Sequence, residues 1–352
     1  MNWYQVTWWK WLCVVLLFYV IGGSWLVPLA PGISKIEPLT FSADSAYTFK
    51  ITGYNTHFAQ ADAGKTQVWF KNGNRYFAAQ KVSLHATHEL TATFGISSLQ
   101  ADSLQTNFDL VINNDYDGTF ALRDGITLLP VKAVDSSAFP LAYSAEVEVV
   151  HNKHQFLAFP YREILYESIR NTFFHVPMWF VMTALVFFSL VTSIFYLATG
   201  KLKYDIYSSQ AIVASLLFGT CGLLTGMMWA NYTWGRPWVN DPKLNGAAIG
   251  VLIYFAYIVL RGSITDDVKR ARISAAYNIF ALVVFLLFIY IMPRLTDSLH
   301  PGNGGNPAFS KYDLDSSMRL FFYPACIGWI LLGFWILSIL IRLQLIQQKQ
   351  EQ

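Results

Sequence analysis

Charged residues are scarce in this chain: they make up 13% of its 352 residues, whereas hydrophobic residues make up 54%. Soluble globular domains carry roughly 25% charged residues. The composition therefore excludes an ordinary soluble protein and predicts a polytopic membrane protein. The formal net charge is only +3, and most of the cations lie in short stretches beside apolar runs, which leaves no footprint for nucleic acid.

Cysteine is rarer still. The three cysteines, Cys13, Cys221 and Cys326, all lie within apolar runs, and no two of them form a CxxC pair. This pattern excludes a dithiol redox centre and predicts buried structural thiols.

The chain contains several long apolar runs. A helix needs about 20 apolar residues to cross about 30 Å of hydrocarbon. Six segments reach or approach that length, and none of them contains a histidine: about 11–30, 177–199, 208–230, 245–260, 273–293 and 319–341. The first follows Lys10 as a signal peptide would, but its length and the poor cleavage site LVPLAPG favour a retained anchor.

Lysine and arginine predict the orientation. Nine of them flank the ends that six alternating spans bring to one side: Lys10, Lys201, Lys203, Arg261, Lys269, Arg270, Arg272, Arg342 and Lys349. The positive-inside rule makes that side cytoplasmic, so both termini are predicted inside a plasma (inner) membrane. The other side, the periplasm of a Gram-negative cell, receives residues 31–176, the loop 234–241 and residues 294–317.

The stretch 36–160 differs from the rest because charge and turn residues return. Runs with period two, such as Phe108–Ile112 and Ala145–Val149, are separated by turn signals at Gly73 and Gly118. The fold class predicted is a polytopic α-helical membrane protein with an inserted β-rich, sandwich-like domain. Its parts are residues 1–30 (tail and first span), 31–165 (β-rich insertion), 166–342 (five-helix membrane core) and 343–352 (cytoplasmic tail).

Five of the seven histidines fall in the β-rich insertion, including the pairs His85/His88 and His151/His154. On a strand, residues three apart point to opposite faces, so neither pair is a ready metal site. We expect these histidines to be solvated.

The two remaining histidines lie at the outer rim of the membrane core. His175 precedes Pro177, which is expected in the first turn of the second span because proline lacks an N–H that would be unpaired there. His300 follows the fifth span and is followed by Pro301. The loop WGRPWVND, which holds Trp234 and Trp238, joins the third and fourth spans at the same rim. Two imidazoles and an indole surface could hold an iron porphyrin, although tryptophan also collects at membrane interfaces without a binding role.

Three motifs resemble the CcmC-like family of haem-handling (WWD-domain) cytochrome c maturation proteins. Arg170-Asn-Thr-Phe-Phe-His175-Val-Pro177 is similar to the family's R-x-x-(Y/F)-x-H-V-P, and Gly226-Met-Met-Trp229 through Asp241 is similar to its WWD loop. Ser298-Leu-His300-Pro lies where the second family histidine follows the fifth helix. The resemblance covers residues 165–342.

This resemblance implies that the protein binds haem non-covalently at the periplasmic face, with His175 and His300 as axial ligands and Trp234 and Trp238 beside the ring. It implies delivery of the haem to a periplasmic haem chaperone (CcmE-like) during cytochrome c biogenesis, with ABC-transporter subunits and a small membrane protein as partners. Such proteins transfer haem and are not enzymes in the strict sense.

Two features depart from the family pattern. Asn240 stands where the family has a third tryptophan, and the β-rich insertion replaces a short loop. The insertion contains no H-x-x-x-Y sequence, the motif of covalent haem attachment in the chaperone.

Haem propionates favour cationic donors, and Arg236 is the predicted partner because it lies inside the tryptophan loop; Lys243, Arg294 and Arg319 are the other outer cations. Asp241 is expected to cap the fourth span or to pair with a cation rather than to contact iron. Glu167 and Arg170 are expected to make local helix contacts.

Two other functions fit parts of the sequence. A cytochrome c synthetase (haem lyase) of the same superfamily would join haem to apocytochrome, but that branch has further histidines within its spans. A membrane receptor could use the β-rich domain as an outer sensor, but it would need a cytoplasmic output module, and the predicted tail after Arg342 is short. A transporter is disfavoured because the spans hold almost no ionisable residue.

Overall fold

The computed structural model describes residues 7–42, 46–95, 106–129, 143–144, 147–152, 154–296, 298–300 and 314–351. The chain divides into a helical unit, Met1–Leu26 with Glu167–Gln352, and a β unit, Val27–Tyr166. The predicted fold class, a polytopic helical protein with an inserted β-rich domain, is confirmed.

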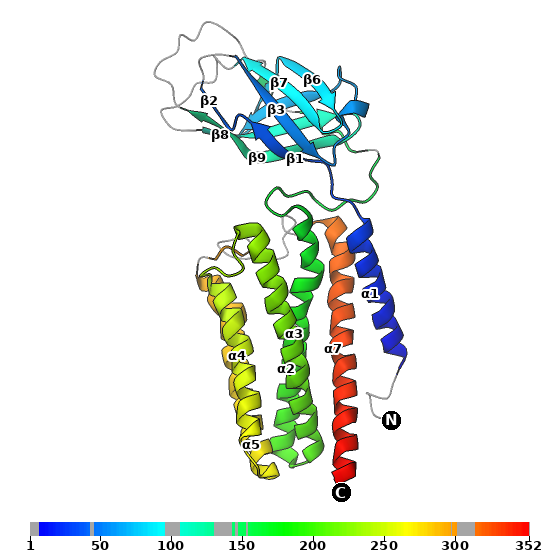
Figure 1. Ribbon diagram of the computed structural model, residues 1–352, viewed down its shortest axis with the longest axis vertical. Helices are drawn as coiled ribbons and strands as arrows, with labels where there is room; N and C mark the ends of the chain where they lie inside the picture. Colours follow the sequence, from blue (N-terminus) through cyan, green and yellow to red (C-terminus); the bar gives the residue numbers. More distant parts are fainter. Residues whose placement is uncertain are drawn as a thin grey trace. The chain divides into compact units, whose positions relative to one another are not determined.

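Within the described residues, six helices are long and apolar enough to cross a membrane. Figure 1 shows them side by side in the helical unit. The helices and their bounds are α1 (Trp8–Leu26), α2 (Thr172–Thr199), α3 (Leu202–Trp234), α4 (Pro242–Gly262), α5 (Asp267–Leu286) and α7 (Ser316–Glu351). The six predicted spans are therefore present, and the short fourth one forms a helix of 21 residues.

The helix ends differ from those predicted, most clearly at α2. The short 3-10 helix η3 (Tyr166–Asn171) leads into it, so Pro177 is an interior residue and the prediction that it occupies the first turn is wrong. An interior proline leaves the carbonyl four residues earlier without its helical donor. Here that carbonyl, on Phe173, accepts a hydrogen bond of 3.1 Å from the indole Nε1 of Trp329 on α7, which explains how α2 tolerates the proline.

The first and last membrane helices, α1 and α7, also end at other residues than predicted. Helix α1 ends at Leu26, two residues before Pro28, because proline disfavours the helical conformation of the residue before it. Helix α7 continues to Glu351, through the residues assigned to a tail.

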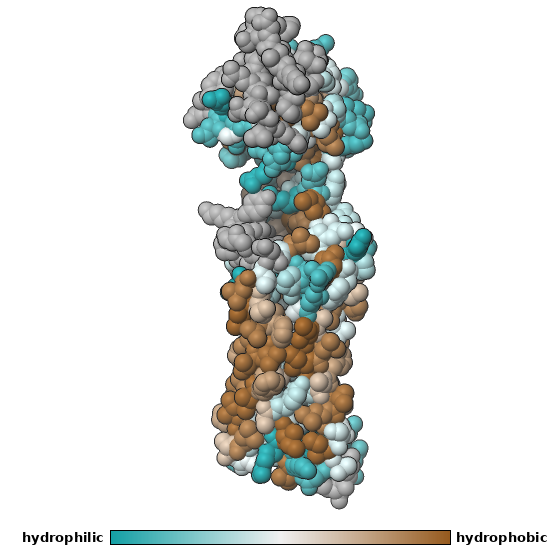
Figure 2. All heavy atoms as spheres, turned by 90° about the vertical axis from the view of Figure 1, so that its left-hand side faces the viewer, coloured by the Kyte–Doolittle hydropathy of each residue, from teal (hydrophilic) through white to brown (hydrophobic). Residues whose placement is uncertain are grey.

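Helix α2 is central to the helical unit, since it packs against α3, α5 and α7. Small residues allow these close contacts, as is usual between membrane helices. A Cβ added at Gly219 of α3 would lie 2.6 Å from the Met182 sulfur, and one at Gly333 of α7 would lie 2.4 Å from Val181. Figure 2 shows that apolar side chains cover much of the visible face of the unit, as a lipid-facing surface requires.

Helix α5 does not end regularly. It continues as a π-helical turn, η4 (Leu287–Ile291), and then as α6 (Met292–Leu295). The widened turn places the Phe288 carbonyl against α4, where a Cβ at Gly246 would lie only 2.4 Å from the carbonyl oxygen. Such π-bulges are frequent at functional sites, and this one precedes the segment that holds His300.

The β unit consists of two sheets, drawn as two layers in Figure 1. Their strand orders are β1-β3-β7-β6 and β10-β5-β4-β8-β9-β2. The strands are β1 (Gly32–Glu37), β2 (Thr40–Ser42), β3 (Ala46–Tyr54), β4 (Gln67–Asn72), β5 (Arg75–Ala78), β6 (Lys81–Ala86), β7 (Glu89–Gly95), β8 (Thr106–Asn114), β9 (Gly118–Leu129) and β10 (Tyr143–Ser144). All the described pairs are antiparallel except β2 with β9.

Aromatic rings from both sheets form the core between them. Phe49 and Phe94 of the first sheet contact Phe70 of the second, with ring centroids 5.3 and 3.8 Å apart. These three rings are fully buried. The sandwich predicted from alternating residues is therefore the architecture of this unit.

One of the two runs with period two is a strand and the other is not. Phe108–Ile112 lies in β8. Gly73 occupies its predicted turn and Gly118 begins β9 directly after the other one, both with positive φ. In the second run, residues 147–149 form no strand, and 145–146 lie outside the described residues. The described residues of this run make isolated hydrogen bonds instead of a strand ladder; for example, Asn113 Nδ2 donates to the Glu148 carbonyl.

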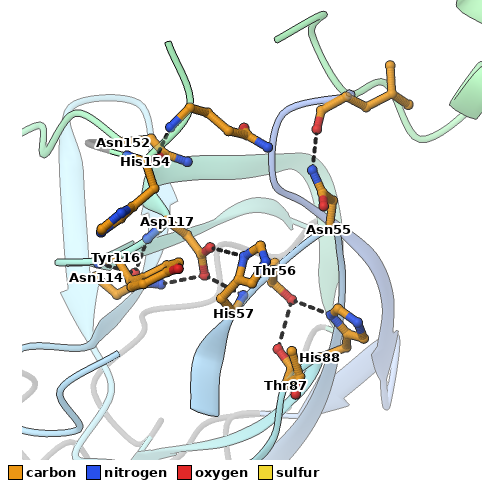
Figure 3. A network of polar contacts seen from close by, with 12 residues as sticks. Asn55, Thr56, His57, Thr87, His88, Asn114, Tyr116, Asp117, Asn152 and His154 are labelled. Carbon is orange, nitrogen blue, oxygen red and sulfur yellow. Dashed lines mark hydrogen bonds and ion pairs between the residues drawn. The ribbon is translucent and has the colours of Figure 1, made fainter. Parts of the chain in front are cut away.

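A polar network ties the β8–β9 turn to the loop after β3 (Figure 3). The buried carboxylate of Asp117 accepts hydrogen bonds from the backbone N–H of His57 at 2.9 Å and from its Nδ1 at 3.0 Å. The His154 ring stacks on Tyr116 with centroids 4.0 Å apart. Of the predicted pairs, His85 is the penultimate residue of β6 and His88 lies in the following turn, while His151 and His154 lie outside strands.

Candidate functional site

The first turn of α2 places His175 against α3. Its Nδ1 lies 3.1 Å from the Gly222 carbonyl oxygen and 3.1 Å from the Thr225 hydroxyl oxygen. A carbonyl can only accept, and the Thr225 hydroxyl already donates to the carbonyls of Cys221 and Gly222. Nδ1 therefore carries the proton, and Nε2 is left as an unprotonated nitrogen.

Gly226 of α3 leaves space for the imidazole ring of His175. A Cβ added at Gly226 would lie 2.8 Å from Cε1 of His175. The imidazole thus lies directly against the backbone of α3, at a position where a side chain would displace it.

A buried carboxylate positions His300. Its Nδ1 lies 3.1 Å from Oδ1 of Asp241, whose side chain is 1% exposed. Asp241 is also the N-cap of α4, because its side chain accepts from the backbone N–H groups of Lys243 and Leu244. The cap is the role that the sequence predicts for Asp241; the bond to His300 adds a second one.

The same carboxylate fixes the backbone around His300. Oδ2 of Asp241 accepts a hydrogen bond of 2.8 Å from the Leu299 N–H, and Ser298 accepts one of 3.1 Å from the His300 N–H. Burial opposes ionisation of Asp241, but the bonds from Leu299 and Ser298 outweigh it and lower the pKa of the carboxyl below its usual range.

The protonation state of His300 follows from its surroundings. Burial is the largest effect, the nearby Lys243 ammonium adds to it, and together they lower the pKa of His300 to about 4 although Asp241 opposes the shift. The imidazole is therefore neutral at pH 7. Since Asp241 holds the Nδ1 proton, Nε2 carries the free lone pair, as at His175.

Two tryptophans flank His300. Its ring centroid lies 5.1 Å from that of Trp234, in an edge-to-face arrangement, and 5.9 Å from that of Trp229. The two indoles also contact each other at 5.1 Å. Trp234 is one of the predicted stacking residues, whereas Trp229, one residue of the same motif, was not assigned a role.

Trp238, the other predicted stacking residue, has a different setting. Its Nε1 donates to Asn245 Oδ1 at 3.3 Å, and Asn245 donates to Asn240 Oδ1 at 2.9 Å. Asn240, which stands in place of the third family tryptophan, thus belongs to a polar chain that joins the loop to the first turn of α4.

Both histidines lie at the same end of the helical unit. His175 contacts α3 at Gly222, and the two indoles beside His300, those of Trp229 and Trp234, lie seven and twelve residues further along the same helix. These separations correspond to about 10 and 18 Å of rise. The imidazoles therefore approach α3 at successive levels near its C-terminal end.

The cations predicted to bind the haem propionates differ in how close they lie to the histidines. Lys243 is half-buried, and its charge acts on both His175 and His300. Arg236 is exposed on the loop. The structure thus brings Lys243 to the histidines, while a contact of Arg236 with a ligand stays a prediction.

Arg170 anchors the start of α2. Its Nε donates to Glu167 at 2.5 Å, and its Nη1 donates to the Ser24 carbonyl of α1 at 2.6 Å. The predicted local contact with Glu167 is present, and the bond to α1 is an additional one.

This donor set suits an iron that is already chelated. Among the described residues, no group of three or more His, Cys, Asp or Glu side chains could hold a bare metal ion. Two neutral imidazoles with free Nε2 atoms would serve as nitrogen ligands to a haem iron, which the porphyrin already chelates. The residues present therefore fit haem.

The sequence signals of the supporting residues are weak. Gly222 contacts His175 through its backbone carbonyl and Thr225 through its hydroxyl, and neither residue belongs to a recognisable sequence motif. The glycine at 226 and the indole at 229 do lie within the quoted Gly226-Met-Met-Trp229 motif, so this motif was the available signal.

Comparisons with known proteins point to the same segment. Residues 165–300 match the family model described as cytochrome C assembly protein. The chain is 33% identical over 94 residues to cytochrome c biogenesis protein CcsA of Prochlorococcus marinus (strain NATL1A), which covers 27% of this chain and 30% of the relative. It is 36% identical over 80 residues to CcsA of Ranunculus macranthus, which covers 23% of this chain and 25% of the relative. The chain thus spans less than a third of the length of these relatives.

Proposed function

We propose that this protein, whose residues 165–300 match the family model described as cytochrome C assembly protein, acts in cytochrome c biogenesis by binding haem at the end of the helical unit that carries His175 and His300. Their Nε2 atoms are the proposed axial ligands. The observation that carries the proposal is a hydrogen bond that both imidazoles make. In each of them Nδ1 donates to an acceptor, which leaves Nε2 free to bind iron.

The surrounding residues have complementary roles in this proposal. The Asp241 carboxylate orients His300 and raises the basicity of its Nε2, as acceptors behind ligating histidines generally do. Trp229 and Trp234 supply apolar, polarisable surface beside the porphyrin. In this proposal haem is the cargo that the protein would transfer.

Lys243 is the proposed partner of a haem propionate. Its charge acts on both histidines, and α4 holds it next to the Asp241 cap. Arg236 is the competing candidate from the sequence. We expect Lys243→Ala to weaken haem binding about tenfold, the loss of one charge-assisted hydrogen bond of 1.4 kcal/mol, and Arg236→Ala to weaken it less. The reverse order would assign the propionate to Arg236.

The test of the proposed function is a haem titration of the purified apoprotein, followed by its Soret absorbance. The wild type is expected to bind one haem, and the double variant His175→Ala, His300→Ala is expected to bind none with comparable affinity. His85→Ala, at an exposed position in β6, is the matched control. A wild-type protein that stays colourless with haem present would refute haem binding and favour the receptor function.

We propose further that haem leaves this site for a periplasmic haem chaperone, with ABC-transporter subunits and a small membrane protein as partners, and that both termini lie in the cytoplasm. Co-expression with an apocytochrome distinguishes delivery from synthesis. Delivery predicts no covalent cytochrome c without the chaperone, whereas a haem lyase would form it alone.

A further inference from the structure

A second polar centre lies inside the helical unit, away from the histidines. Three helices contribute its hydrogen-bonded members, near the end where α2 stops and α3 starts. The members that hydrogen bond to each other are Ser189 and Ser193 of α2, Ser208 of α3 and Asn278 of α5. Each of them is at most 2% exposed.

These bonds are short and connected. Asn278 Nδ2 donates to the hydroxyls of Ser189 at 2.7 Å and Ser193 at 3.0 Å. The Ser208 hydroxyl lies 2.9 Å from Ser189 and 2.7 Å from Ser193. Uncharged polar residues commonly join membrane helices in this way, but helix joining requires only that partners satisfy each other.

Several polar atoms of this centre have no partner. Within the described part of the chain, no hydrogen bond reaches Asn278 Oδ1, the Ser274 hydroxyl or, on the facing helix α4, the Tyr254 hydroxyl. All three side chains are 0% exposed. An unsatisfied polar group buried in protein costs about 1–3 kcal/mol, so these groups call for an occupant.

An ion pair lies where this centre approaches the helix ends. Arg261, one residue before the end of α4, donates to both carboxylate oxygens of Asp205, in the first turn of α3, at 2.8 and 2.5 Å. Their side chains are 18 and 10% exposed. The Tyr257 hydroxyl lies beside this pair and Ser208, which connects the pair to the interior.

We infer that this centre is a hydrated site, which binds ordered water inside the membrane-spanning bundle and is reached from the Asp205–Arg261 end. Water fits because it both donates and accepts: the hydroxyls offer donors, and Asn278 Oδ1 offers an acceptor. A bound ion fits less well, since the charges of Asp205 and Arg261 neutralise each other. Ser189 lies ten residues before the end of α2, so the water extends about 15 Å into the bundle.

The first test uses the unaltered protein in lipid nanodiscs, with hydroxyl-radical footprinting. Hydroxyl radicals form from water, so radicals formed from bound water oxidise nearby side chains even when these are buried. We expect Tyr254 and Tyr257 to be oxidised about tenfold faster than Phe218, which is buried in a different hydrophobic cluster. Equal, slow oxidation of all three would overturn the inference.

The second test measures access. In a background with Cys13, Cys221 and Cys326 replaced by serine, Ser189→Cys is treated with a charged methanethiosulfonate reagent, which reacts with thiolates in water. The matched control is Ser215→Cys, at a buried serine whose hydroxyl donates to the Ile212 carbonyl of the same helix, α3. Faster modification of Ser189→Cys supports a hydrated site, and equal protection of both overturns it. Neither test depends on haem.

Discussion

Asp241 offers the sharpest perturbation of the proposed haem site. Its carboxylate caps α4 and also binds His300 Nδ1 and the Leu299 N–H. The variant Asp241→Asn separates these roles, because asparagine is as good an N-cap as aspartate but is uncharged and cannot accept all of these bonds with one oxygen.

The expected magnitudes follow from the two roles. Loss of the group behind a ligating histidine lowers metal affinity about 10- to 100-fold, or about 1.4–2.7 kcal/mol. The free energy of unfolding should change by less than about 1 kcal/mol, since the cap survives. Asp241→Ala should lose both the haem affinity and about 1 kcal/mol of capping.

The assay is a haem titration of apoprotein together with thermal unfolding in the same detergent. Asp266→Asn is the matched control, because Asp266 caps α5 by accepting from the Lys269 N–H at 2.6 Å. It lies at the end of the helical unit opposite to Asp241. It should leave haem affinity unchanged. Wild-type affinity in Asp241→Asn, with His300 required for binding, would refute the positioning role.

Three further predictions concern other contacts. Gly226→Ala should displace the α2 imidazole, because the new Cβ would lie 2.8 Å from it, and should lower haem affinity about tenfold; Gly22→Ala, with open space around it, should not. Asp205→Ala should destabilise the helical unit by about 3 kcal/mol by isolating Arg261, and the double variant Asp205→Leu, Arg261→Met should recover most of this in thermal unfolding. Asp117→Ala should destabilise the β unit by about 2 kcal/mol in hydrogen exchange, without changing haem affinity.

Each of these has a contradicting outcome. An unaltered titration of Gly226→Ala would mean that the imidazole can move without cost. A double variant as unstable as Asp205→Ala would show that the ion pair contributes more than mutual neutralisation. Loss of haem affinity in Asp117→Ala would extend the binding site to the β unit.

The positions of the spans could be predicted from the sequence, because only apolar segments of sufficient length cross a membrane. Their ends could not. Helix α3 begins at Leu202, six residues before the predicted 208, since Lys203 and Asp205 are compatible with helix but not with hydrocarbon. At Pro177 the prediction failed for a tertiary reason: Trp329 of a distant helix satisfies the carbonyl that proline leaves free.

The candidate site could be predicted in part. Counting spans brings His175 and His300 to the same end, as the structure has them. The arrangement of indoles depends on how α3 ends: Gly235, with φ of 72°, stops the helix after Trp234, so Trp229 and Trp234 share one helix while Trp238 follows the turn. The buried cluster around Asn278 was missed because serine, tyrosine and asparagine carry no charge and do not interrupt an apolar run.

The most direct test of the account is the coordination state of the iron, measured by electron paramagnetic resonance and visible spectroscopy on the haem-loaded protein. Two imidazole ligands predict a six-coordinate, low-spin ferric haem. His175→Gly and His300→Gly should each give a five-coordinate, high-spin haem that added imidazole returns to low spin. A high-spin wild-type spectrum, or a low-spin spectrum that survives both substitutions, would contradict the claim that these two histidines share one iron.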